Sequence, residues 1–152
     1  TASRLWYQRV GSKIPVKASP ESVMKEAVLA SLVEAESLTG KESPILAGIF
    51  LNRLSKRMRL QSDATVVYAW DEKGVRKDKL SYSDLKIKSP FNTYLVNGLP
   101  PAPICVPSES SWKSALSPQK SEYLFFFTDK DGRFIYSKTY SEHLANQRKH
   151  GL

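Results

Sequence analysis

The chain has 152 residues, a hydrophobic fraction of 41% and a formal net charge of +8. This length suits one globular domain with a buried core, and no apolar run approaches the roughly 20 residues that a membrane-spanning helix needs. The single cysteine excludes an internal disulfide bond and a multi-cysteine metal site, while the positive charge favours anionic partners such as nucleic acid, anionic lipid or an acidic polymer.

The N-terminal region predicts a lead-in followed by one domain. Residues 1–18 show no clear hydrophobic period, so we expect an extended segment there and a single domain over residues 19–152. Thr1 is not an initiator methionine. We therefore expect the chain to be a fragment of a longer protein, whose remainder holds any targeting or anchoring segment.

Two helices are predicted next. Ser19 precedes a proline, which is the usual arrangement at a helix start, and an apolar period continues to about Leu38 before Gly40. Ser43 precedes a second proline, and helical spacing continues from there to about Arg57. Both helices lie in the N-terminal half.

The second half of the chain changes character. Residues 89–108 are rich in proline and predict a rigid, irregular loop, because proline fixes φ and lacks an N–H donor. Helices followed by a β-hairpin predict an α+β fold, arranged around a glutamate-bearing helix. The other elements that we expect are a short helix capped by Asp63, a charged loop over 71–79, a short helix over 111–116, strands over 122–128 and 134–137, and a last helix from Thr139 to about Arg148.

Glu34 is the most unusual residue of the sequence. It follows the apolar or small residues 28–33, a pattern typical of a buried helix. A carboxylate is costly there unless it is paired, protonated or used in chemistry. We expect burial to raise the pKa of Glu34, so that it stays protonated and can act as an acid. Glu36 lies about 200° away on a helical wheel and cannot share a face with Glu34. We interpret Glu36 as an ion-pair partner, and a direct catalytic role for it stays open.

The other residues exclude several reaction classes. There is no glycine-rich phosphate loop and no cluster of cysteines and histidines at metal-ligand spacing, so we expect neither a metal nor a cofactor. We interpret His143 as a surface helix residue; a Ser/His/Asp triad that includes it stays open, although no nucleophile elbow accompanies it. Carboxylate chemistry remains, and glycan cleavage is the reaction class that most often relies on it.

Several motifs in a fixed order resemble the YceG-like catalytic domain of the MltG-type endolytic murein transglycosylases. Motifs that match in register are a specific signal, although any one of them alone would be weak. The resemblance implies a bacterial enzyme that acts on peptidoglycan glycan strands at the extracytoplasmic face of the cytoplasmic membrane. It also implies a membrane anchor outside this chain and peptidoglycan synthases as candidate partners. The matching segments are Ala30–Glu36, Phe50–Leu54, Met58–Tyr68, Ser89–Tyr94, Gly98–Ile104 and Tyr140–His143.

The resemblance also implies a catalytic residue, since the first glutamate of the family's first motif corresponds to Glu34. In lytic cleavage one acid protonates the oxygen between N-acetylmuramic acid and N-acetylglucosamine. The resulting carboxylate then takes the proton of the muramoyl 6-hydroxyl, whose oxygen closes a 1,6-anhydro ring. No water is consumed, so no second carboxylate is needed to activate one.

Amide and hydroxyl side chains in the matched motifs are the candidate glycan-binding residues. Structural roles stay open for several of them: Asp63 as a helix cap, Asn92 as a turn residue and Tyr94 as a core residue. Arg53 is interpreted as closing the second helix or pairing with a carboxylate. The candidate set is Gln61, Asp63, Thr65, Asn92 and Tyr94.

One position departs from the family. The resemblance predicts a glycine-x-histidine-x-phenylalanine run in the hairpin, whereas Gly132 is followed here by Arg133 and Phe134, so that Phe134 stands in place of the histidine. If the hairpin lines the glycan groove, we expect Phe134 to stack against a sugar or to pack under the groove wall.

Two further functions stay open. A non-catalytic glycan-binding module could keep the same fold, but the retention of Glu34 argues against it. A nucleic-acid-binding domain is motivated by the positive charge alone, and the sequence has neither a recognition motif nor a basic stripe interleaved with aromatic residues. We therefore expect no nucleic-acid partner.

Overall fold

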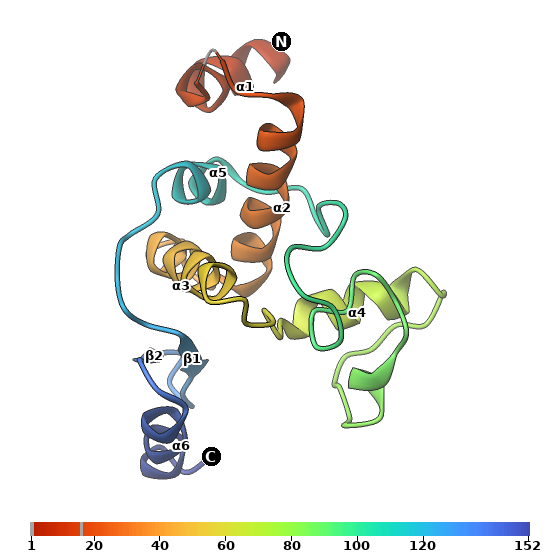
Figure 1. The fold of residues 1–152 in the computed structure, drawn as a ribbon, viewed down its shortest axis with the longest axis vertical. Helices are drawn as coiled ribbons and strands as arrows, with labels where there is room; N and C mark the ends of the chain where they lie inside the picture. Colours follow the sequence, from red (N-terminus) through yellow and green to blue (C-terminus); the bar gives the residue numbers. More distant parts are fainter. Residues whose placement is uncertain (1, 16) are drawn as a thin grey trace.

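The computed structural model describes residues 2–15 and 17–152. Helices dominate the N-terminal part, and a two-stranded antiparallel hairpin precedes the last helix, which confirms the α+β class (Figure 1). The elements are α1 (Ala2–Arg9), η1 (Gly11–Lys13), α2 (Pro20–Glu36), α3 (Ser43–Ser55), α4 (Asp63–Asp71), η2 (Asp84–Lys86), α5 (Glu109–Leu116), β1 (Phe125–Thr128), β2 (Phe134–Ser137) and α6 (Tyr140–Lys149).

Local capping signals explain where the helices begin. The Ser19 hydroxyl accepts a hydrogen bond from the backbone N–H of Ser22 at 3.1 Å and caps α2, as predicted. At the start of α6 the Thr139 hydroxyl accepts from the Glu142 N–H at 3.1 Å. The prediction for α4 is wrong in one respect, because its N-cap is Ser62 and Asp63 is its first residue.

The N-terminal segment is helical rather than extended, so the predicted extended lead-in is wrong. The Trp6 side chain of α1 meets Trp112 of α5 edge to face, with ring centroids 5.8 Å apart. Val10 directly follows α1 and is 1% exposed. These tertiary contacts stabilise a helix that is too short to be stable alone.

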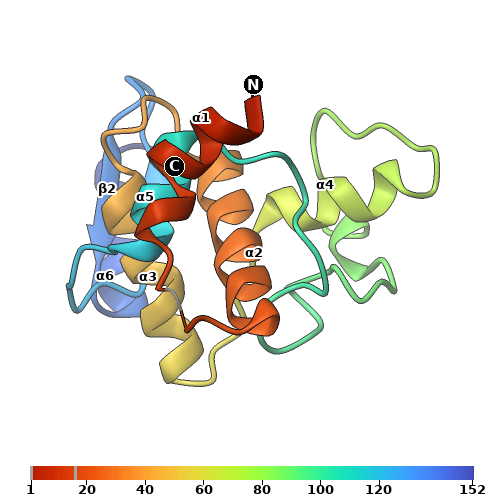
Figure 2. The same ribbon diagram turned by 90° about the horizontal axis from the view of Figure 1, so that it is seen from above.

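α2 is the central helix and packs against α3, α4 and α5 (Figures 1 and 2). Its apolar run 28–33 is buried, as predicted. A second, smaller core forms between α4 and the loop that follows it, around Val66, Ala69, Ile87 and Phe91. Within the described residues, no helix combines the length and the apolar character that crossing a membrane requires.

The hairpin and α6 form a unit at the end of the molecule away from α1 (Figure 1). Phe125 pairs with Ser137, and Thr128 pairs with Phe134. In the turn, the Asp129 carboxylate accepts from the backbone N–H groups of Asp131 and Arg133, both at 2.9 Å. Those bonds to the backbone lower the pKa of Asp129.

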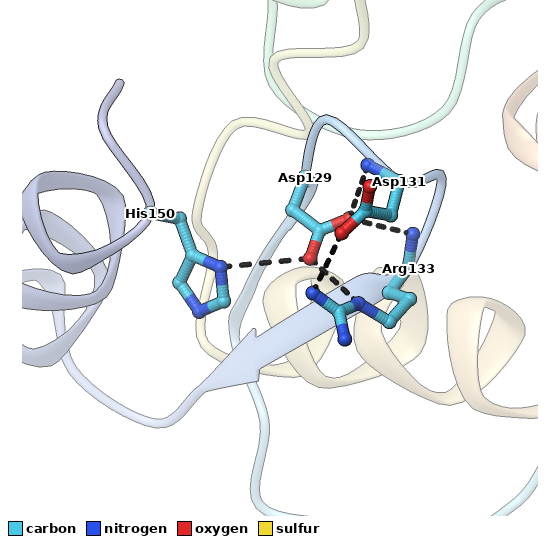
Figure 3. A network of polar contacts seen from close by, with 4 residues as sticks. All are labelled: Asp129, Asp131, Arg133 and His150. Carbon is cyan, nitrogen blue, oxygen red and sulfur yellow. Dashed lines mark hydrogen bonds and ion pairs between the residues drawn. The ribbon is translucent and has the colours of Figure 1, made fainter.

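Asp129 also ties the hairpin to the end of α6 (Figure 3). The Arg133 Nε atom donates to its Oδ2 atom at 2.9 Å, and His150 Nδ1 lies 3.5 Å from the same oxygen. The His150 ring also meets Phe127 edge to face, at 5.8 Å between centroids. These contacts fix the C-terminal end of α6 against the hairpin.

Candidate active site

A cleft of about 400 Å³ lies between the helical body and the unit formed by the hairpin and α6. Its body wall comes from the C-terminal end of α2, from α3, from the segment before α4 and from the loop around Tyr94. Its other wall comes from β1 and α6. The lining residues are Glu36, Phe50, Arg53, Leu60, Gln61, Ser62, Asp63, Tyr94, Phe125, Phe126, Phe127, Thr128, Tyr140, His143 and Gln147.

Glu36 is the carboxyl group that the fold holds in this cleft. It is the last residue of α2, its side chain is half-buried, and the Ser62 hydroxyl donates to its Oε1 atom at 2.8 Å. Burial raises the pKa of Glu36, and the neighbouring charge of Asp63 raises it further, while the bond from Ser62 acts in the opposite direction. The arrangement favours the protonated form of a general acid.

Asp63 and Tyr94 form a pair beside Glu36. The Tyr94 hydroxyl donates to Asp63 Oδ1 at 2.6 Å, across two segments that are 31 residues apart in the chain. The pKa of Tyr94 is raised by burial and by its bond to the Asp63 carboxylate, so the hydroxyl stays protonated. The structure thus brings these two predicted binding residues to the cleft, with Asp63 close enough to influence Glu36.

Gln61 lines the same cleft and has an unusual backbone. Its φ angle is 51°, in the left-handed region that non-glycine residues rarely adopt. The conformation is held by a hydrogen bond from the Gln61 N–H to the Thr93 carbonyl at 3.1 Å, and the side chain is exposed at the cleft. Strained backbone of this kind concentrates at functional sites, and here it belongs to a residue with an amide side chain at the cleft.

Arg53 joins the two walls. Its Nε atom donates to the Leu124 carbonyl at 2.6 Å, just before β1, and its Nη1 atom donates to the Arg59 carbonyl at 2.8 Å. Its guanidinium also lies 4.9 Å from the centroid of the Phe125 ring. The side chain is 8% exposed, and its donors bind carbonyls instead of closing the second helix or pairing with a carboxylate as interpreted from the sequence.

Glu34 faces a different part of the molecule. Its Oε2 atom accepts from the Ser108 N–H at 3.0 Å and from the hydroxyls of Ser108 and Ser111, both at 2.6 Å. These bonds, led by that from the Ser108 hydroxyl, outweigh the effect of burial and lower the pKa of Glu34, so the predicted net rise is wrong. The side chain lies at a separate pocket and holds α2 to the N-terminal end of α5.

Two predicted binding residues are interior instead. The side chains of Thr65 and Asn92 are fully buried, at 0% exposure, and neither lines the cleft, so the structure does not place them with the other predicted binding residues. The Thr65 hydroxyl donates to the Ser62 carbonyl at 2.7 Å, and it also contacts the Thr93 hydroxyl at 2.8 Å. Thr65 therefore supports the segment that carries the cleft residues.

Asn92 organises the loop after α4. Its Nδ2 atom donates to the carbonyls of Leu85 and Ile87 at 2.9 Å and 2.8 Å, and its Oδ1 atom accepts from the Tyr94 N–H at 2.9 Å. All three hydrogen bonds join the Asn92 side chain to backbone groups of the same loop. The side chain consequently fixes the place of Tyr94 without touching the cleft.

We expect Asn92→Ala to act on stability before activity. It leaves two carbonyls and one N–H without their partners in the interior, which costs about 3 kcal/mol at about 1 kcal/mol each. Urea denaturation of this variant should show a lower midpoint. Gln61→Ala is the matched control, because its side chain is exposed and the midpoint should hardly change. An Asn92→Ala variant as stable as the parent would contradict this role.

Phe134 lies behind the cleft wall. Its ring is 6.1 Å from that of Phe126, which lines the cleft, and 6.2 Å from that of Tyr136. Phe134 is not itself among the lining residues. Its contacts match the expectation of packing under the wall more closely than that of stacking on a sugar.

The wall of the cleft that α6 contributes was not identified from the sequence. Tyr140, His143 and Gln147 lie three and four residues apart on α6 and all line the cleft. The interpretation of His143 as a surface residue is wrong, because its ring is half-buried and stacks on Phe125 with centroids 5.3 Å apart. The spacing of Tyr140, His143 and Gln147 in the sequence is the pattern that could have predicted their shared face of α6.

Comparisons of the sequence with a family profile and with known proteins agree on one family. The profile of the YceG-like family matches residues 3–149. A protein of Bacillus subtilis (strain 168) named endolytic murein transglycosylase is 41% identical over 138 residues, covering 91% of this chain and 38% of the relative. A protein of the same name from Streptococcus pneumoniae is 32% identical over 141 residues, covering 89% of this chain and 25% of the relative.

A solved structure agrees with the fold. A crystal structure of a YceG-like protein from Listeria monocytogenes superimposes with a TM-score of 0.74 at 44% sequence identity, over 82% of this chain and 39% of that chain. The chain thus spans well under half the length of the relatives that it matches.

Proposed function

Since this chain belongs to the YceG-like family, we propose that it carries the catalytic site of a lytic transglycosylase. Its substrate is the glycan of peptidoglycan, cleaved within the strand at the bond between N-acetylmuramic acid and N-acetylglucosamine. The relatives named endolytic murein transglycosylase support this substrate and this reaction.

The observation that carries the proposal is Glu36, a carboxyl group with a raised pKa in an open cleft lined by polar and aromatic side chains. Glu34 was the residue assigned from the resemblance. We propose Glu36 as the catalytic acid instead, because Glu34 is bound by three donors outside the cleft and has a lowered pKa.

The reaction follows from one titrating group. Protonated Glu36 donates its proton to the glycosidic oxygen, and the bond from that oxygen to C1 of the muramoyl sugar breaks with oxocarbenium character. The Glu36 carboxylate then accepts the proton of the 6-hydroxyl, whose oxygen bonds to C1. The products are a new 4-hydroxyl end and a 1,6-anhydro-muramoyl end, and Glu36 is protonated again.

Neighbouring groups fit these steps. The Ser62 hydroxyl holds Glu36 Oε1, so the acid keeps one orientation through both proton transfers. The charge of Asp63 favours the protonated acid before the reaction and also favours the positive charge that develops on the sugar. The Gln61 amide and the Tyr94 hydroxyl supply polar contacts at the same wall.

The setting of the activity is also a proposal. The extracytoplasmic face of the cytoplasmic membrane is where peptidoglycan strands are found, so we propose that the chain works there. A membrane anchor outside residues 1–152 and an interaction with peptidoglycan synthases remain predictions from the family resemblance, as does the domain boundary at residue 19.

Product mass tests the proposal. Incubation with purified sacculi should release fragments with 1,6-anhydro-muramoyl ends, which are about 18 Da lighter than hydrolysis products because no water is added. Mass spectrometry against a muramidase digest of the same sacculi gives the comparison. Predominantly hydrated ends would make this a hydrolase, and Asp63 would then become the candidate for activating water or attacking C1.

A further inference from the structure

We propose that His143 binds the substrate, donating a hydrogen bond from Nε2–H to the acetamido carbonyl of an N-acetylated sugar in the cleft. The choice of an acetamido sugar rests on the proposed function. The contact lies on the wall opposite Glu36 and would select for 2-acetamido groups.

The position of His143 comes from α6 and its packing on β1. Its ring stacks on Phe125 at an interplanar angle of 29° and meets Phe127 edge to face at 5.7 Å. Tyr140, one turn earlier, has its ring 6.3 Å away. Aromatic neighbours therefore hold the imidazole on several sides, and His143 lines the cleft.

The two ring nitrogens have different surroundings. In the described part of the chain, His143 Nδ1 is the one buried side-chain nitrogen or oxygen that has no hydrogen-bond partner. A proton on Nδ1 would be a buried donor without an acceptor, which is costly. The neutral ring consequently carries its proton on Nε2, and this N–H is the donor available to a ligand.

Burial and a nearby positive charge both favour the neutral form of this ring. Burial lowers the pKa of His143, and the nearby guanidinium of Arg53 lowers it further. Arg53 and His143 share Phe125 as a neighbour, at 4.9 Å and 5.3 Å from its centroid. A protonated imidazole would place a second cation beside Arg53. His143 thus offers one neutral donor.

The surroundings of that donor fit an acetamide. Phe125, Phe127 and Tyr140 line the same wall and present apolar ring surface. An acetamido group has a neutral carbonyl acceptor and a methyl group, so it satisfies the donor and buries its methyl against the rings. A sugar with a hydroxyl at position 2 lacks both the carbonyl oxygen that extends to this donor and the methyl group that the rings would bury.

Binding of two neutral tetrasaccharides tests the proposal. Titration calorimetry would compare tetra-N-acetylchitotetraose with cellotetraose, which has hydroxyls in place of acetamido groups, in a Glu36→Gln background that prevents turnover. We expect the parent to prefer the chitotetraose by about tenfold. His143→Phe keeps an aromatic ring without a donor and should lose most of this preference, while His143→Gln keeps an amide N–H and should retain most of it.

Several results would overturn the proposal. They are a parent without preference for the acetylated sugar, a folded His143→Phe variant with the parent's preference, and equal losses in the Phe and Gln variants. If His143→Phe fails to fold, the ring NMR signals of the parent decide: chitotetraose should shift the His143 Nε2 resonance, and an unshifted resonance refutes the contact. Sacculus digestion by the parent chain tests the proposed function separately, because it does not depend on this preference.

Discussion

Glu36→Gln is expected to lower the rate of glycan cleavage by at least ~100-fold, the low end of what general acid–base catalysis contributes. Glutamine keeps the size of the side chain and can still accept the hydrogen bond from Ser62, but it cannot donate a proton to the glycosidic oxygen. Release of anhydro-ended fragments from sacculi measures the rate. A folded variant that cleaves at the parent rate would refute the assignment.

The same substitution should not destabilise the fold. The pKa of Glu36 is raised above its ordinary value of 4.5, so the folded state favours the neutral form. Stability contributed by that preference is fully present below the unfolded pKa and is lost as pH rises through the folded pKa. Glutamine stays neutral throughout, and thermal unfolding near pH 7 should therefore occur at an equal or higher temperature.

Glu34→Gln is the matched control for this prediction. Its carboxylate accepts three hydrogen bonds at the start of α5, and its pKa is lowered, so it contributes stability above its unfolded pKa that is lost as pH falls through its folded pKa. We expect this variant to cleave glycan while unfolding more easily at neutral pH. Loss of cleavage here, with normal cleavage by Glu36→Gln, would return the catalytic role to Glu34.

These two glutamates show what a sequence can and cannot reveal. An apolar run that ends in carboxylates indicates a functional helix end, and residues 28–33 are buried as that pattern predicts. Which carboxylate is usable depends on distant segments. Glu34 accepts hydrogen bonds from Ser108, which lies 74 residues away in the sequence, and Glu36 accepts one from Ser62, which lies 26 residues away. Helical geometry separates the two side chains but does not say which side becomes the cleft.

The helix boundaries were predictable for a local reason. Serine and threonine caps, prolines in the first turn and apolar spacing act within a few residues, so the starts of α2 and α6 follow from the sequence. α1 was missed because its stability comes from the contact between Trp6 and Trp112, which is a tertiary effect. The residues around Trp6 in the sequence do not reveal that it packs on Trp112.

The binding candidates divide for a related reason. Amides and hydroxyls are suited both to holding irregular backbone and to holding a sugar, and the sequence does not separate these uses. Asn92 and Thr65 hold the backbone from the interior. Gln61, Asp63 and Tyr94 reach the cleft. The division depends on which side of the loop faces solvent, and packing of the loop against α4 decides it.

Arg53→Met is expected to lower both stability and cleavage. Methionine fills much of the same volume but leaves the carbonyls of Leu124 and Arg59 without the donors that they have now. We expect a loss of about 3 kcal/mol in the free energy of unfolding, since hydrogen bonds to charged groups contribute about 1.5–3 kcal/mol each. Because those carbonyls belong to opposite walls, the cleft should also lose its shape. Urea denaturation and sacculus digestion measure the two effects.

Arg53→Lys separates geometry from charge. Lysine keeps the positive charge, but its single ammonium cannot reproduce the planar set of donors that spans both walls, so we expect most of the same loss. Arg76→Met is the control for removal of a surface cation, because the Arg76 side chain is 90% exposed in a loop, and it should leave both readouts unchanged. A lysine variant with parental stability and activity would show that charge near Phe125 suffices and that the hydrogen bonds to the two walls do not shape the cleft.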